Sequence, residues 1–291
     1  MPRPGGRGRA SCTLNRVKGL ANGWDRTKGR PEPIRALNRV RERENHEPLV
    51  DLREACPRVI MARPSVIPYL RRTVAEKLHA ASLTLPVDFR LGVVDAWRPF
   101  PRQVLIFERM WDWLEEARPG LSHAQKRRIV CRFVAPTDQK APPGHTTGAA
   151  VDVHLLDPQT LESLDVSAPF TRLQGAPTYK FGLSQESQER RTALIHAMLG
   201  AGFSNCRDEW WHYSWGDAGW AVREGLDECV YGRIDLPESE YAVLGRRQRH
   251  MTIPSEMCIR DRIMMASNWA IAPGCRGASR VRRRWPGVSR T

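Results

Sequence analysis

Residues 142–152 read PPGHTTGAAVD, and the rest of the chain is interpreted outward from this stretch. It places His145 and Asp152 seven positions apart, with Gly148 and two alanines between them. An imidazole and a carboxylate both bind divalent metals, and Zn²⁺ accepts nitrogen and oxygen ligands in tetrahedral geometry. Because two protein ligands do not hold a catalytic metal tightly, the stretch predicts a third ligand elsewhere in the chain.

The segment DEWWH at residues 208–212 offers that third ligand. It contains His212 as a nitrogen donor and Glu209 as a carboxylate one turn or one strand step away. Three protein ligands with an open position for water form the arrangement of a hydrolytic zinc site. The sequence therefore predicts a metal centre of His145, Asp152 and His212, divided between two distant segments.

The composition indicates a globular domain with charged ends. The chain has 291 residues, 41% of them hydrophobic, which suffices for the core of one large domain or two small ones. The formal net charge is +14, but residues 1–45 carry 12 Lys/Arg against 4 Asp/Glu, and residues 246–291 carry 11 against 2. The body between them is slightly acidic. Basic ends rich in Gly, Pro and Arg are typical of solvated tails rather than of nucleic-acid-binding modules.

Cysteine spacing and hydropathy indicate the compartment. The seven cysteines are scattered and form no C-x-x-C pair, so we predict neither a disulfide framework nor a thiolate zinc site. No apolar run reaches the length of a signal peptide or a membrane span. We therefore expect a cytoplasmic protein with no membrane partner.

The predicted domain spans residues 46–244. Residues 1–45 are interpreted as a basic disordered tail or non-native leader, and residues 245–291 as a basic tail that resembles translated adapter sequence. Apolar spacing within the domain predicts helices and strands in alternation. The expected helices are 69–83, 104–117, 124–133 and 188–201, and the expected strands are 49–52, 89–94, 149–155 and 209–213.

The stretch DAWRP at residues 95–99 adds a cation at the end of an expected strand. Pro99 disfavours helical backbone at Arg98, so the guanidinium is predicted to lie at a strand end or turn. Taken alone, Arg98 could equally be a surface ion-pair residue.

DAWRP, GHTTGAAVD and EWWH, in that order, resemble the zinc D,D-dipeptidases of the VanX type, which are relatives of the VanY-type D,D-carboxypeptidases. The family pattern is approximately S-x-H-x-x-G-x-A-x-D followed by E-x-W-H, and the 67 positions between His145 and His212 agree with the family spacing. The resemblance extends over about residues 49–241.

The resemblance implies a role for each of five residues. His145, Asp152 and His212 match the ligands of one Zn²⁺ per chain, Glu209 matches the catalytic base, and Arg98 matches the arginine that binds substrate and stabilises the transition state. The chemistry agrees, since zinc lowers the pKa of water, a carboxylate moves the proton, and a guanidinium stabilises the developing oxyanion. The implied fold is α+β, a small antiparallel sheet flanked by helices, with the zinc cleft between the halves.

Several neighbouring residues have less certain roles. The family serine two positions before the first histidine is Pro143 here, which affects substrate specificity rather than the metal site. Trp210 and Trp211 are candidates for substrate binding, although packing residues that shape the pocket fit the pattern better. Asp208 could hold a ligating histidine by a hydrogen bond. His154 follows Asp152 by two positions on one strand face and is an alternative ligand outside the family pattern.

The expected reaction is hydrolysis of the dipeptide D-alanyl-D-alanine, in turnover of peptidoglycan precursor or in glycopeptide resistance. One alternative is a D,D-carboxypeptidase or endopeptidase that acts on longer cell-wall peptides. A dipeptidase must exclude substrates extended at the amino end, so closure of the pocket distinguishes the two. A non-enzyme alternative is nucleic-acid binding through the basic tails. The sequence leaves the oligomeric state open.

Overall fold

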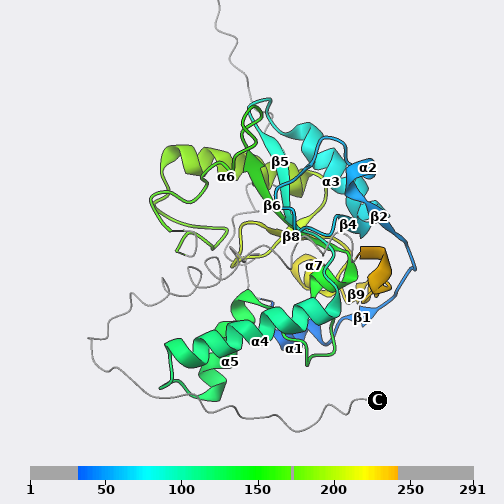
Figure 1. The fold of residues 1–291 in the computed structure, drawn as a ribbon, viewed down its shortest axis with the longest axis vertical. Helices are drawn as coiled ribbons and strands as arrows, with labels where there is room; N and C mark the ends of the chain where they lie inside the picture. Colours follow the sequence, from blue (N-terminus) through cyan, green and yellow to red (C-terminus); the bar gives the residue numbers. More distant parts are fainter. Residues whose placement is uncertain (1–31, 172–173, 242–291) are drawn as a thin grey trace, which may run out of the picture.

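A computed structural model describes residues 32–171 and 174–241 of the chain (Figure 1). Its main sheet has five strands in the order β3-β5-β6-β8-β7. The neighbours β3 and β5 run parallel, whereas all other neighbours are antiparallel. The expected α+β class is therefore confirmed, with one parallel edge pair that the pattern did not predict. The strands are β3 (Ile60–Met61), β5 (Arg90–Asp95), β6 (Ala150–Leu156), β7 (Ser204–Asn205) and β8 (His212–Ser214).

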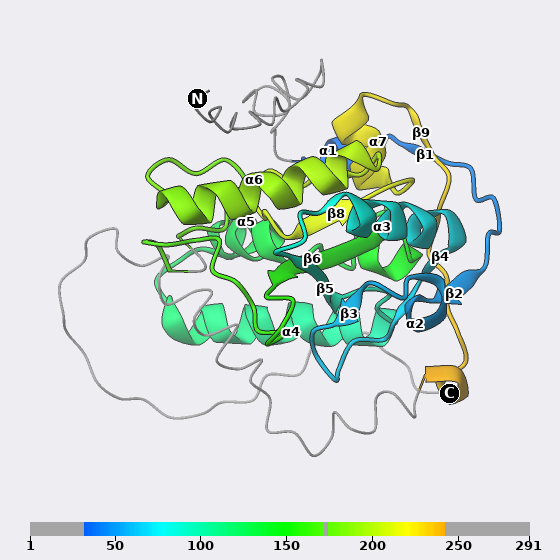
Figure 2. The same ribbon diagram turned by 90° about the horizontal axis from the view of Figure 1, so that it is seen from above.

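The helices α3 (Arg72–Thr84) and α6 (Gln185–Gly200) lie on one side of the sheet, and α4 (Phe100–Ala117) lies on the other (Figure 2). The main core is formed where α3 and α6 meet alternate residues of β6, namely Val151, Val153 and Leu155. Each of these three side chains is fully buried, which contributes about 1.5–3 kcal/mol for a side chain of this size. Since strand side chains alternate in direction, Asp152 points to the opposite face.

A helical hairpin on that opposite face has a small core of its own. Helices α4 and α5 (His123–Phe133) pack against each other through Met110, Leu114, Val130 and Val134. Ser122 begins α5 with a reciprocal capping box to Gln125, which satisfies free backbone donors at the helix start. The hairpin packs mainly on itself.

The prediction that residues 1–45 form a tail is wrong for residues 32–45. This segment contains α1 (Ile34–Leu37) and β1 (Arg41–Glu42), and β1 pairs with β9 (Glu228–Cys229). Val40 is buried in a second small core with α7 (Ala218–Glu224). The charged composition of this segment suggested a solvated tail. Some of its charges are instead used in contacts with the domain, since Glu44 forms an ion pair with the buried Arg71. Residues 1–31 and 245–291 lie outside the described residues.

Several element boundaries differ from the predicted ones, and α4 and α6 begin earlier than expected, at Phe100 and Gln185. Residues 69–71 form strand β4 (Tyr69–Arg71), paired with β2 (Leu49–Asp51) outside the main sheet, so α3 begins three residues later than expected. The short helix α2 (Leu52–Ala55) follows β2. Glu209 lies in the turn that precedes β8 rather than in the strand. No helix within the described ranges is both long and apolar enough to span a membrane.

Candidate metal centre

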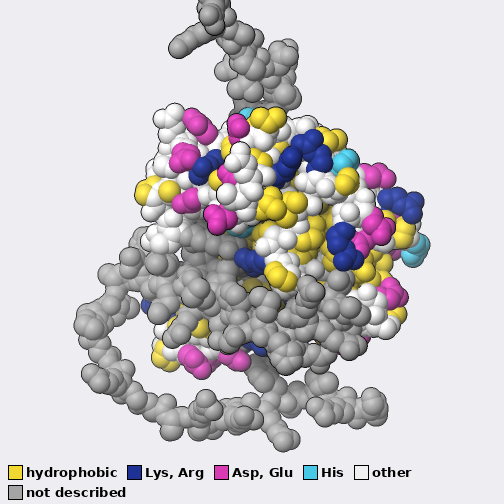
Figure 3. All heavy atoms as spheres, turned by 45° about the horizontal axis from the view of Figure 1, so that its top comes forward, with side chains coloured by type: hydrophobic (Ala, Val, Ile, Leu, Met, Phe, Trp, Pro, Cys, Tyr) yellow, Lys and Arg dark blue, Asp and Glu magenta, His cyan; other side chains and the backbone are white. Residues whose placement is uncertain are grey.

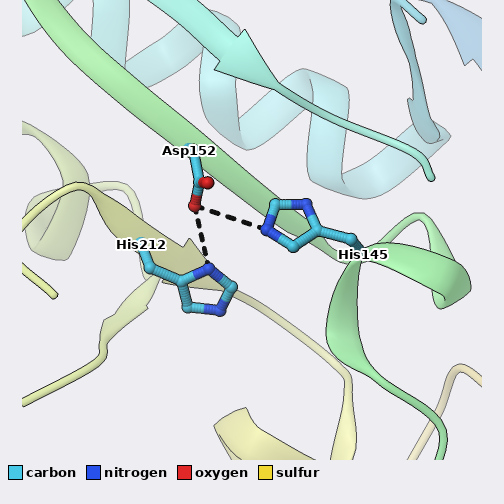
Figure 4. Close-up of side chains that lie close together, drawn as sticks. All are labelled: His145, Asp152 and His212. Carbon is cyan, nitrogen blue, oxygen red and sulfur yellow. Dashed lines mark hydrogen bonds and ion pairs between the residues drawn. The ribbon is translucent and has the colours of Figure 1, made fainter. Parts of the chain in front are cut away.

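Two adjacent strands and one short helical turn present the predicted ligands (Figure 4). Asp152 of β6 lies directly opposite His212 of β8 in the antiparallel register. His145 comes from the 3₁₀ turn η2 (Gly144–Thr147), just before β6 begins. Because Asp152 points away from the main core, the three side chains converge on the face of the sheet that looks toward α4 and α5.

The donor atoms are spaced as a small cation requires. Asp152 Oδ1 lies 3.3 Å from His145 Nε2 and 3.0 Å from His212 Nδ1. All three donor atoms lie within 4.8 Å of one another. Bonds of about 2.1 Å in tetrahedral geometry place two ligand atoms about 3.4 Å apart. The residues therefore fit a divalent ion such as Zn²⁺, with two nitrogen donors and one oxygen donor.

The ring of His145 is held in the orientation that a ligand needs. Its Nδ1 lies 2.8 Å from the carbonyl oxygen of Ala96. A carbonyl oxygen only accepts hydrogen bonds, so Nδ1 carries the proton and Nε2 keeps its lone pair for a metal. The buried position of the ring, 6% exposed, fixes this arrangement.

The charges of the site favour a cation. Burial by itself would raise the pKa of Asp152, but the neighbouring His145 and His212 hold it well below its usual range. Burial would lower the pKa of His212, yet its hydrogen bond with Asp152 raises it. The carboxylate is therefore ionised at neutral pH and attracts positive charge, whether from a proton on His212 or from a metal.

Arg98 lies beside this site, at the end of β5. Its Nη2 and Nε contact Asp95 Oδ2 at 2.5 and 3.1 Å, and its Nη1 donates to Gln103 Oε1 at 2.5 Å. Gln103 in turn donates to the carbonyl of Ala135 at 2.8 Å, and the backbone N–H of Arg98 donates to the carbonyl of His145 at 3.0 Å. The guanidinium is therefore fixed from two sides.

Asp95 and Gln103 were not predicted as site residues. Asp95 lies opposite Asp152 in the strand register, and burial would raise its pKa, but Arg98 lowers it. The three-residue spacing from Asp95 to Arg98 was visible in DAWRP. Gln103 gave no signal, because its contact depends on the direction of the first turn of α4.

The turn before β8 places Glu209 at the same site. Its carbonyl accepts the backbone N–H of His212 at 3.2 Å, and its carboxylate interacts electrostatically with both His212 and Arg98. A cleft of about 640 Å³ is lined by all five predicted metal and catalytic residues, Arg98, His145, Asp152, Glu209 and His212. The structure thus gathers segments that lie far apart in the sequence.

Three neighbouring residues occupy other places. Trp210 and Trp211 are 2% and 1% exposed, belong to the main core, and are not among the residues that line the cleft. We therefore do not assign substrate binding to them. His154 packs edge-on against Trp210, with ring centroids 5.0 Å apart, and is not part of the metal-binding group.

Asp208, which the sequence suggested as a partner of a ligating histidine, contacts arginines. It forms ion pairs with Arg132 of α5 at 3.0 Å and with Arg207 at 3.1 Å. The hydrogen bond that orients His145 is instead donated by its own Nδ1 to the backbone carbonyl of Ala96. A backbone carbonyl leaves no residue-type signal in a sequence.

Comparisons with known proteins agree with the motifs. A family model described as D-ala-D-ala dipeptidase matches residues 64–229. A D-alanyl-D-alanine dipeptidase of Synechocystis sp. is 32% identical over 200 residues, which cover 58% of this chain and 80% of that protein.

Two solved structures share a more distant likeness. One is a mutant of the vancomycin resistance D,D-pentapeptidase VanY in complex with Zn(II), at 16% identity and a TM-score of 0.33, covering 54% of this chain and 80% of that one. The other is VanYB in complex with D-alanine-D-alanine, at 15% identity and a TM-score of 0.33, covering 63% and 84%. On the family match and the relative from Synechocystis, the chain belongs to the D-Ala-D-Ala dipeptidase family, peptidase family M15, and is a hydrolase of the peptidase class.

Proposed function

We propose that this peptidase hydrolyses D-alanyl-D-alanine with one Zn²⁺ held by His145, Asp152 and His212. The observation that carries the proposal is the convergence of these three donor atoms in a cleft that also contains Glu209 and Arg98. A bound Zn²⁺ would supply Lewis acidity and lower the pKa of water toward neutrality. The remaining chemistry belongs to the side chains around it.

Glu209 is proposed as the general base and acid. A carboxylate at the rim of the metal group accepts the proton of the attacking water and passes it to the leaving amine. The short turn to His212 supports this role, because it fixes the backbone of Glu209 relative to one ligand, and Glu209 lines the same cleft. Catalysis of this kind contributes about 10²–10⁴-fold to the rate.

Arg98 is proposed to stabilise the negative charge that develops on the substrate carbonyl oxygen. Removal of one such donor lowers kcat by about 10²–10³-fold in enzymes that use them. The contacts to Asp95 and Gln103 hold the guanidinium in place before substrate binds, so little reorganisation is needed during the reaction. Arg98 also qualifies as a substrate-binding residue on the same geometry.

The second candidate is a D,D-carboxypeptidase that acts on longer cell-wall peptides. A cleft of about 640 Å³ lies within the usual 300–1,000 Å³ range of small-molecule sites, so its volume alone admits more than a dipeptide. Pro143, at the position of the family serine, lines this cleft and leaves the recognition of the charged substrate ends to other residues.

The proposed substrate suggests a cellular role. Hydrolysis of the free dipeptide would serve turnover of peptidoglycan precursor or glycopeptide resistance. A cytoplasmic location would suit such a substrate, since assembled cell wall lies outside the membrane.

The test is release of D-alanine from two substrates by the zinc-loaded protein. D-Ala-D-Ala and an N-acylated tripeptide that ends in D-Ala-D-Ala are supplied separately, with a chelator-treated sample as control. We expect release from the dipeptide that depends on zinc. Release from the tripeptide alone would select the carboxypeptidase, and release from neither would reject the peptide-hydrolysis proposal.

A further inference from the structure

The N-terminal segment 32–37 forms a wall of the cleft that contains the metal group. Glu32, Ile34 and Leu37 line this cleft together with His145 and Asp152. The segment precedes residue 64, where the family match begins. This part of the cleft wall is therefore built from chain that the family comparison does not include.

Several contacts hold this wall in place. Glu32 forms an ion pair with Arg223 of α7, whose side chain is only 5% exposed. Arg223 also donates to Ser204 Oγ at 2.9 Å, which ties the pair to the main sheet. One residue past α1, Asn38 accepts the backbone N–H of Ala141 at 3.0 Å. Because these contacts precede and follow the helix in the chain, α1 is fixed against α7 at one end and against the loop that leads to His145 at the other.

The cleft has opposite charges at its two sides. Beside α1 and α7 it is lined by the carboxylates of Glu32 and Asp217, and Glu32 is paired with Arg223. These two carboxylates outnumber that cation. Along α5 it is lined by Arg128 and Arg132, with Arg207 nearby. Asp208 pairs with Arg132 and Arg207, so guanidinium groups outnumber the carboxylate on this side. A free dipeptide carries an ammonium group at one end and a carboxylate at the other. The excess of negative charge beside α1 and of positive charge along α5 would orient its amino end toward α1 and its carboxyl end toward α5.

We propose that segment 32–37 ends the amino side of the substrate site and thereby selects free dipeptides over amino-extended peptides, an inference that rests on the proposed D,D-dipeptidase activity. Ile34 and Leu37 are separated by one helical turn and place apolar side chains where an added residue would run. Acylation of the amino group also removes the positive charge that the excess of carboxylates beside α1 and α7 would attract.

The decisive variant is Ile34→Ala, with Arg35→Ala as its matched control. Arg35 lies on the same helix, is exposed, and is not among the residues that line the cleft. The measured quantity is kcat/KM for N-acetyl-D-Ala-D-Ala divided by kcat/KM for D-Ala-D-Ala. Removal of several methyl and methylene groups from a pocket wall changes such discrimination by about tenfold or more. We expect a rise of that size in Ile34→Ala and none in Arg35→Ala.

A binding measurement gives a second readout. Calorimetry measures the affinity for a phosphinate isostere of the dipeptide, with and without an N-acetyl group. We expect the difference between these two affinities to be smaller in Ile34→Ala than in the wild type. Thermal unfolding of both variants establishes that each is folded. Leu37→Ala provides a second opening of the wall, although Leu37 also packs against the small core with α7.

The outcomes separate the inference from the function on which it rests. If Ile34→Ala and Leu37→Ala cleave the dipeptide with an unchanged kcat/KM ratio and an unchanged binding preference, the proposed role of segment 32–37 is overturned, while the proposed function stands. A wild-type preference for the acetylated substrate would also overturn it, while leaving a peptidase. Cleavage of neither substrate by the wild type would reject the proposed function and the wall together.

Discussion

Asp152 shows how a single residue links the core to the proposed chemistry. Its neighbours Val151 and Val153 are fully buried in the main core, so strand alternation turns the carboxylate to the other face. The register with β8 then places His212 directly across from it. The AAVDV pattern predicted the strand, and its alternation explains why the Asp152 carboxylate faces away from the main core.

Substitution of the proposed base separates turnover from metal binding. We expect Glu209→Gln to retain zinc and lose D-alanine release by about 10²–10⁴-fold, because the amide cannot accept the proton. His212→Ala serves as the comparison and is expected to lose the metal. Metal content and D-alanine release are measured on the same samples. A near-normal rate in Glu209→Gln would show that another group is the base.

The planar guanidinium group of Arg98 is expected to contribute to catalysis through its geometry as well as its charge. Arg98→Lys keeps one positive charge but cannot contact Asp95 and Gln103 together, so the cation loses its fixed position. We predict a fall in kcat of about 10²–10³-fold with zinc retained. Arg90→Lys, at the other end of β5, is the control. Equal kcat values for Arg98→Lys and the wild type would argue against the oxyanion role.

At the scale of elements, the junction between η2 and β6 sets the site. Gly148 ends η2 with φ +72°, a conformation that L side chains rarely adopt. A Cβ there would lie 2.4 Å from Leu49 Cδ2, so the end of that side chain would also have to move. This glycine turns the backbone from His145 into the strand that bears Asp152.

Gly148→Ala is predicted to destabilise the fold by more than about 1 kcal/mol, through strain at positive φ and the clash with Leu49. Gly120→Ala is the matched control, because nothing lies within 4 Å of a Cβ at that position. Urea unfolding of both variants measures the difference. Equal midpoints for Gly148→Ala and Gly120→Ala would contradict the proposed requirement for glycine.

Glu47 connects the segment before β2 to α3 and predicts a pH dependence. It accepts hydrogen bonds from Tyr231 and from Thr73, whose Oγ1 lies 2.7 Å away. Burial would raise the pKa of Glu47, but these hydrogen bonds lower it. A lowered pKa in the folded state gives stability that is complete above the unfolded value of about 4.3 and is lost as pH falls through the folded value.

We therefore expect Glu47→Gln to be less stable than the wild type at pH 7, with the difference shrinking below about pH 4. Glu54→Gln, at an exposed carboxylate, is the control. Chemical unfolding at pH 7, 5 and 3 provides the measurement. A constant difference across this range would show that the Glu47 carboxylate is not the source of the pH dependence.

The sequence predicted the elements that depend on local interactions and missed those that depend on contacts between distant segments. Helical spacing located α3, α4, α5 and α6 because their apolar faces repeat locally. It missed β4, since Tyr69 to Arg71 become a strand only by pairing with β2. The motifs predicted the five residues that the structure gathers in one cleft. The contact of Gln103 with Arg98 depends on tertiary packing and gave no signal.

At the scale of the whole molecule, the charge distribution favours an enzyme over a nucleic-acid-binding protein. The positive formal charge is concentrated in the terminal segments, most of which lie outside the described residues. On the face shown in Figure 3, Lys/Arg and Asp/Glu side chains are interspersed rather than gathered into one basic surface. The described residues thus offer no single-sign field on that face for a polyanion.

A chain of residues 32–241 is predicted to keep the D-alanine release of the full chain within about twofold, since every residue assigned to the site and its wall lies inside it. A chain of residues 46–241 is the comparison. It loses Glu44, the partly buried partner of the buried Arg71, and is expected to be less stable because that guanidinium then lacks its carboxylate. Equal stability of the two chains would contradict the revised domain boundary.

Zinc titration of the chelator-treated protein tests the central claim most directly. D-alanine release from D-Ala-D-Ala is recorded as Zn²⁺ is added, alongside His212→Ala. We predict that release is absent at first, rises in proportion to added zinc, and levels off at one equivalent per chain, while His212→Ala stays inactive. Full release before zinc is added, or an equal response from His212→Ala, would contradict a single catalytic zinc held by His145, Asp152 and His212.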